Sequence, residues 1–248
     1  MPSLAIERLE SALQARHFDH TLASHRRFVE GVARVAPTGW ASLDAPLGGG
    51  WARGELSEIV GARSSGRTGL ALATLAAATR RGEVAAYVDA VDRLDPVSAA
   101  AAGMDLSRLL WIRGPALTAE QARPAAIDDA VSKAVRAFDL VLRAGGFAVA
   151  VLDLADISPR VIRALPPATW MRLARVMDGA TGTAGRDTAG LILGDAPVSR
   201  SAGGVSVRLT ATGVWAGQSP QQHRLARLAI RAEIVSARHI QGALRVGA

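Results

Sequence analysis

The stretch that most constrains this chain runs over residues 55–68, ELSEIVGARSSGRT, where an apolar strand meets a glycine-rich turn and a helix begins. The spacing Gly61-x-x-x-x-Gly66-Arg67-Thr68 is that of a phosphate-binding loop, in which backbone N–H groups at a helix start face the anion. Arginine replaces the expected lysine, and its larger planar guanidinium makes this exchange non-conservative. The alternative interpretation is a tight strand-to-helix turn without a ligand.

Strand and helix patterns alternate after Pro37, which predicts an α/β fold with a mainly parallel twisted sheet covered by helices on both faces. The segment 147–154 is continuously apolar and contains Asp153 near its end, as expected for a central strand. The predicted strands are 55–60, 84–90, 109–113, 147–154 and 189–194, and the helices between them cover 67–81, 119–144 and 168–178.

The pattern changes near the C-terminus. Residues 205–215 and 228–234 alternate between apolar and polar side chains, which predicts two half-exposed strands joined by a turn at 217–220. We expect them to form an antiparallel extension of the sheet. The predicted organisation is therefore an N-terminal helix and linker (1–36), a core (37–238) and a C-terminal tail (239–248).

The N-terminal segment predicts an amphipathic helix over residues 3–17, because Ile6, Leu9 and Leu13 recur at helical spacing. This apolar stripe either packs on its own core or docks on a partner. Three histidines follow within the basic stretch 17–36, but no carboxylate lies at regular spacing beside them. We interpret the stretch as a linker and expect no metal site.

Composition narrows the function classes. The chain has no cysteine, which excludes disulfides and thiolate metal sites, and it lacks any apolar run long enough for a membrane helix. The start of the sequence also lacks the apolar region of a signal peptide, so a soluble cytoplasmic protein is expected. The formal net charge of +7 fits equally a nucleic-acid partner and a solvated basic surface.

The segment 38–78 resembles the opening of the RecA ATPase core, where a TGS-x-x-LD-x-x-LG-x-GG segment precedes a loop of the form GPESSGKT. The likeness continues through YVDAVDRLDP (87–96), which is similar to FIDAEHALDP, and VLDLA (151–155) takes the Walker B place. The segment 201–204 is similar to the TTGG that follows the DNA-binding loops, and the resemblance covers about residues 38–237. It implies a RecA-like P-loop core whose nucleotide-site residues are Gly61, Ser64, Ser65, Gly66, Arg67, Thr68 and Asp153.

Three departures from the RecA pattern argue against ATP hydrolysis. The catalytic glutamate of that family falls at Val91, the loop lysine is Arg67, and the glutamine that senses nucleotide corresponds to Asp195 within a shortened second DNA loop. Asp92 takes the place of the catalytic glutamate, in place of Val91, only if the alignment with the RecA pattern shifts by one residue. These departures predict a vestigial site without a resident cofactor, at which only weak binding of ATP and magnesium is expected.

Within the RecA-like proteins, the segment 36–61 is similar to ImuA, the accessory protein of the bacterial ImuA–ImuB mutagenesis cassette. This resemblance implies a non-catalytic adaptor in DNA-damage-induced translesion synthesis, with RecA and ImuB as partners. Docking of N-terminal helices between RecA protomers makes Ile6, Leu9 and Leu13 the candidate partner interface, and self-association is the alternative.

Other functions stay open. One is a working ATPase of the RecA/RadA kind, which requires Arg67 to grip the phosphates. Another is a DNA-binding module in which Arg160 and Arg163, in the region of RecA's first DNA loop, contact phosphates, unless they only solvate a helix start. A third is a cell-division inhibitor of the SulA type, which shares the RecA fold.

Overall fold

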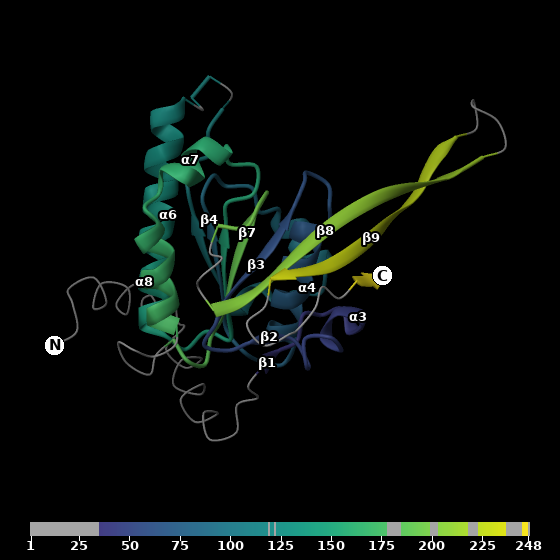
Figure 1. Cartoon of the computed structure of the whole chain (residues 1–248), viewed down its shortest axis with the longest axis horizontal. Coiled ribbons are helices and arrows are strands. Elements are labelled where there is room, and N and C mark those ends of the chain that lie inside the picture. Colours follow the sequence, from purple (N-terminus) through teal and green to yellow (C-terminus); the bar gives the residue numbers. More distant parts are fainter. Residues whose placement is uncertain are drawn as a thin grey trace.

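The fold is built on an eight-stranded sheet with the strand order β10-β9-β8-β3-β7-β6-β4-β5, shown in Figure 1. This computed structural model describes residues 35–118, 120–121, 123–177, 185–198, 203–217, 223–236 and 245–247. The predicted N-terminal helix, its three residues Ile6, Leu9 and Leu13, the three histidines and most of the turn at 217–220 lie outside these residues.

The strands from β8 to β5 run parallel to one another, whereas β9 is antiparallel to β8 and β10 is antiparallel to β9. The main strands are β3 (Leu56–Gly61), β4 (Ala85–Asp89), β5 (Leu109–Arg113), β6 (Val149–Asp153), β7 (Ala189–Gly194), β8 (Gly203–Ala216), β9 (Arg224–Ser236) and β10 (Arg245–Gly247). A separate pair is formed by β1 (Val35–Ala36) and β2 (Trp51–Ala52). The helices are α3 (Ala41–Asp44), α4 (Arg67–Arg80), α5 (Pro96–Ala101), the 3₁₀ turn η2 (Leu106–Arg108), α6 (Pro124–Ala144), α7 (Pro159–Ala164) and α8 (Pro167–Met177).

Helices cover both faces of the sheet, as the continuous apolar strands predict. On one face Leu70 and Leu75 of α4 pack with Val151 of β6. On the other face the neighbouring residue Leu152 packs with Phe138 of α6. Because successive strand residues point to opposite faces, β6 is buried completely and anchors both layers. Figure 1 shows α6 and α8 on one side and α4 on the other.

The predicted α/β fold is confirmed, and the strands at 109–113 and 189–194 have the predicted bounds. The predicted helix at 119–144 was too long, since α6 begins at Pro124, whose missing N–H is tolerated in a first turn. The C-terminal extension differs from the prediction in one respect: β9 is antiparallel to β8 and β10 is antiparallel to β9, whereas β8 pairs in parallel with β3. The prediction missed β1, β2 and β10, because strands of two or three residues carry no periodicity.

Candidate nucleotide loop

The loop from Gly61 to Gly66 joins the buried strand β3 to α4, as the motif predicts. Gly66 takes φ 100° at the N-cap of α4, a conformation that disfavours other residues, and a Cβ there would lie 2.7 Å from Ile230 Cδ1 of β9. The loop borders a cavity of about 500 Å³. Its lining includes Ser64, Ser65, Gly66, Arg67, Thr68 and Asp153, so the structure brings these predicted residues together.

Arg67 is the buried cation of this loop, with 5% of its side chain exposed. Its Nη2 donates to Asp156 Oδ1 at 2.9 Å, and its Nη1 donates to Asp195 Oδ1. Asp156 follows β6 and Asp195 follows β7, so the ends of two central strands converge on the guanidinium. The positive charge that a phosphate would require is thereby already matched by two carboxylates.

Asp153, at the end of β6, is buried at the Walker B place. It accepts hydrogen bonds from the Tyr87 hydroxyl at 2.5 Å and from the Ala155 N–H at 2.8 Å. Burial raises the pKa of Asp153 to about 6, although the Tyr87 hydrogen bond acts in the opposite direction. Burial and the Asp153 carboxylate also raise the pKa of Tyr87. The carboxyl group is therefore easier to protonate than an ordinary aspartate.

The carboxylates on either side of Val91 are bound elsewhere. Asp89 accepts hydrogen bonds from the Arg93 and Leu94 N–H groups. Asp92 receives two hydrogen bonds from the Arg113 guanidinium, at 2.8 and 2.7 Å, and it does not line the loop cavity. Val91 itself packs against the α6 side of the core. A catalytic role for Asp92 by a register shift is therefore unsupported by its contacts.

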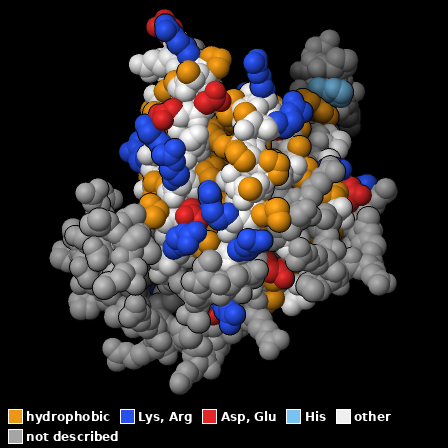
Figure 2. All heavy atoms as spheres, turned by 60° about the vertical axis from the view of Figure 1, so that its left-hand side comes forward, with side chains coloured by type: hydrophobic (Ala, Val, Ile, Leu, Met, Phe, Trp, Pro, Cys, Tyr) orange, Lys and Arg blue, Asp and Glu red, His pale blue; other side chains and the backbone are white. Residues whose placement is uncertain are grey.

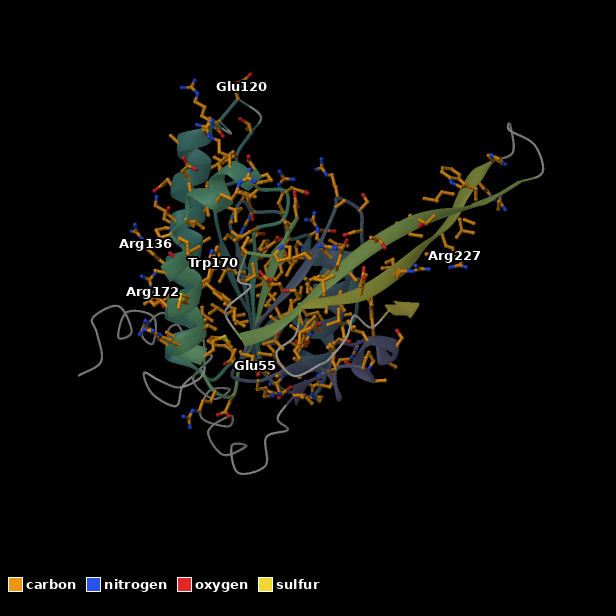
Figure 3. All side chains as sticks on the ribbon, viewed as in Figure 1. Glu55, Glu120, Arg136, Trp170, Arg172 and Arg227 are labelled. Carbon is orange, nitrogen blue, oxygen red and sulfur yellow. The ribbon has the colours of Figure 1, made fainter. Side chains whose placement is uncertain are left out.

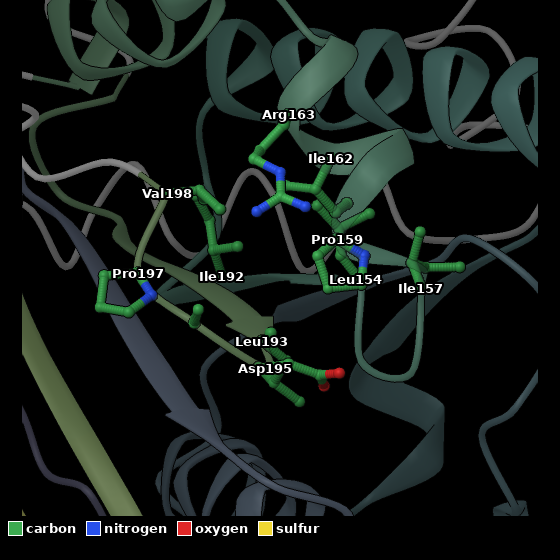
Figure 4. A pocket seen from close by; sticks show the side chains of 12 residues that line it. Leu154, Ile157, Pro159, Ile162, Arg163, Ile192, Leu193, Asp195, Pro197 and Val198 are labelled. Carbon is green, nitrogen blue, oxygen red and sulfur yellow. The ribbon is translucent and has the colours of Figure 1, made fainter.

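A second cavity, of about 180 Å³, lies beside the loop between α7 and the ends of β6 and β7. Its wall is apolar except for Asp195 and Arg163, as Figure 4 shows. The Arg163 guanidinium extends over the cavity between Val198 and Pro159. Arg160 lies on the same helix but does not line the cavity.

Arg160 and Arg163 therefore lie on α7 rather than in an irregular loop. The segment from α7 through α8 carries four exposed arginines, including Arg172 and Arg175, and no acidic residue. Lys and Arg side chains gather on this side of the molecule in Figure 2. In Figure 3, Arg136 and Arg172 extend outward from α6 and α8, whereas Trp170 lies toward the core. The arrangement offers a basic surface, which suits phosphates as well as solvent.

Sequence reasoning missed the role of Asp156 and the ion pairs of Asp195. The signal available for Asp156 was its place three residues after Asp153. Among the residues that the structure describes, no group of three His, Asp or Glu side chains is arranged to hold a metal ion. In the same part of the chain, no helix is long and apolar enough to span a membrane.

The strand-loop-helix element on a central parallel strand defines an α/β protein of the P-loop class. Residues 21–156 match the RecA N-terminal domain, and the chain belongs to that family. Protein RecA of Brucella anthropi is 41% identical over 128 residues, which make up 51% of this chain and 32% of that protein. Protein RecA of Mesorhizobium japonicum is 39% identical over 141 residues, or 56% of this chain and 34% of that protein.

The chain thus spans about a third of the length of these curated relatives. A solved structure extends the likeness in fold. The crystal structure of the RadB recombinase is 20% identical, with a TM-score of 0.55, over 86% of this chain and 94% of that one. Because it covers 86% of the chain, this comparison supports the RecA-like fold beyond the residues of the family match.

Proposed function

We propose that this chain is a non-catalytic RecA-like adaptor in damage-induced translesion DNA synthesis and DNA repair, and that it binds RecA, ImuB or both. RecA and ImuB are proposed as partners because of the resemblance to ImuA. The observation that carries the loss of catalysis is the pairing of Arg67 with Asp156 and Asp195. An incoming γ-phosphate has to displace two carboxylates from a buried guanidinium, which costs more than binding at an open cation.

Two further features support the proposal. Val91 has no ionisable group with which to orient an attacking water, and the carboxylates of Asp89 and Asp92 already have partners. The loop glycines also serve the turn itself, since Gly66 has a φ of 100° at the N-cap of α4, a backbone conformation that favours glycine. The loop is then a structural element whose ligand has been replaced by internal ion pairs.

The first test is a titration with magnesium-ATP, with and without single-stranded DNA, followed by calorimetry and phosphate release. We expect no saturation below about 1 mM nucleotide, which corresponds to less than about 4 kcal/mol of binding free energy. RecA measured in parallel is the positive control. Micromolar binding with turnover would instead establish the active ATPase alternative.

The second test addresses the partners. We expect the full chain to bind immobilised RecA or ImuB, and removal of residues 1–25 to weaken that binding at least about tenfold, because a few buried side chains carry most of the binding energy of an interface. A triple change of Ile6, Leu9 and Leu13 to serine should reproduce the loss, while Glu7→Ser with Glu10→Ser is the matched control.

Each outcome of this second test has a separate meaning. Unchanged affinity after the deletion contradicts docking through the N-terminal helix but leaves the adaptor role. Failure of the full chain to bind either protein contradicts the adaptor role.

A further inference from the structure

The outer half of β9 has a strand on only one side among the described residues. β9 pairs with β8 from Arg224 to Ser236 apart from bulges at residues 226 and 235, but β10 covers only 231–233 on its other side. Next to the part of β9 that β10 covers, residues 227–230 of β9 present a strand edge without a neighbour in the described part of the chain. A strand added at this edge would lie in line with β10. An edge of this kind offers backbone N–H and C=O groups to an added strand. In Figure 1 the β8–β9 hairpin extends away from the helices and the rest of the sheet.

One face of this hairpin is apolar and exposed. Trp215 pairs across the strands with Leu225, and their exposed fractions are 62% and 49%. Leu228, 46% exposed, pairs with Gly213, which has no side chain to separate it from the Trp215 indole. Leu228 also lines the loop cavity, so the apolar face continues from the nucleotide loop outward.

The opposite face is basic. Arg227 pairs across the strands with Val214, Arg224 with Ala216 and Arg231 with Thr210. Within the described residues none of these three arginines forms an ion pair. From residue 196 to residue 248 the sequence contains seven arginines and a single acidic residue, Glu233. Figure 3 shows Arg227 extending from the hairpin.

We propose that residues 227–230 of β9 bind an extended peptide whose side chains alternate between acidic and apolar residues. The peptide adds a strand in line with β10, with its apolar side chains on the Leu225 and Leu228 face and its carboxylates beside Arg227 and Arg231. From Arg227 to Arg231, β9 alternates between its two faces, so a peptide that alternates with period two matches both of them. The β-bulge at residue 226 places Leu225 on the same face as Leu228.

The charge of one face and the apolar character of the other argue against the two simplest other occupants. A second copy paired edge to edge would place the arginines of one β9 against those of the other, which is unfavourable. A nucleic-acid strand would satisfy the arginines but leave the Leu225 and Leu228 face uncovered. This proposal rests on the adaptor role proposed above, because it names the kind of peptide that the adaptor would bind. Peptide binding is measured without RecA or ImuB, so the peptide site and the adaptor role can be contradicted separately.

The test uses a fluorescein-labelled nine-residue peptide of alternating glutamate and valine, with a lysine–valine peptide as control. We expect saturable binding of the glutamate peptide only. Two further glutamate peptides carry N-methyl groups on the odd or on the even residues. Only one of them should lose binding, because alternate N–H groups of an added strand face β9. Equal binding of both methylated peptides contradicts strand addition.

Protein variants complete the test. Arg227→Glu with Arg231→Glu should weaken the glutamate peptide by about tenfold or more and permit the lysine peptide to bind. Arg172→Glu with Arg175→Glu on α8 makes the same charge change elsewhere and should have no effect. Equal loss in both variants overturns the site in favour of general charge attraction. Arginine-dependent binding of oligothymidine without peptide binding, or arginine-dependent dimerisation, overturns it in favour of the excluded occupants.

Discussion

Replacing Asp156 and Asp195 together by alanine is expected to destabilise the protein by about 2–4 kcal/mol, because the buried Arg67 guanidinium loses both carboxylates. Phosphate or sulfate should reverse much of this loss, since the loop N–H groups and the released guanidinium then form an anion site. Wild-type protein should gain little from the same anions. The measurement is urea unfolding with and without phosphate at constant ionic strength.

The matched control for this change is Asp129→Ala, which removes an exposed ion pair with Lys133. That pair is solvent-screened, so the expected loss is below about 1 kcal/mol, and phosphate should have no specific effect. A double variant as stable as the wild type would show that the carboxylates do not hold Arg67. Phosphate stabilisation of wild type and variant to the same extent would show that the loop is already open to anions.

Much of the fold follows from patterns that are local in sequence. The segment 147–154 is apolar at every position except Asp153, and such a run is typical of a parallel strand covered on both faces. The motif at 61–68 likewise fixes a strand, a turn and a helix in order. The parallel pairing of β8 with β3 could not be predicted in this way, because alternation marks a half-exposed strand without specifying the direction of its neighbour.

The sequence predicts which residues form the candidate site, but it does not predict that Arg67 is paired with two carboxylates. Gly61, Gly66 and Asp153 have characteristic spacings, whereas the partners of Arg67 come from the ends of two other strands. Asp195 is 128 residues from Arg67 in the chain, and no spacing rule links them. The sequence shows that a lysine is missing. Only the assembled sheet shows that two carboxylates already pair with Arg67.

The second large expected effect is a dependence of the free energy of unfolding on pH, which arises from Asp153. Its folded-state pKa of about 6 lies above its ordinary value of 3.8, so the folded protein binds the proton more tightly than the unfolded chain. Stability should therefore fall as pH rises from about 4 to about 6, and the full cost of burying the charge, about 3 kcal/mol, is present at higher pH. Asp153→Asn removes this cost while preserving the shape of the side chain.

We expect the Asp153→Asn variant to exceed wild-type stability by about 1–2 kcal/mol at pH 8 and to lose this advantage below pH 4, because one hydrogen bond has to be rearranged. Tyr87→Phe should shift the pH-dependent fall to higher pH, since the hydroxyl opposes the rise in the pKa of Asp153. Urea unfolding across this pH range measures both effects, with Asp129→Asn as an exposed control. A variant less stable than wild type at pH 8 would mean that the hydrogen bonds of the Asp153 carboxylate outweigh the cost of burying its charge.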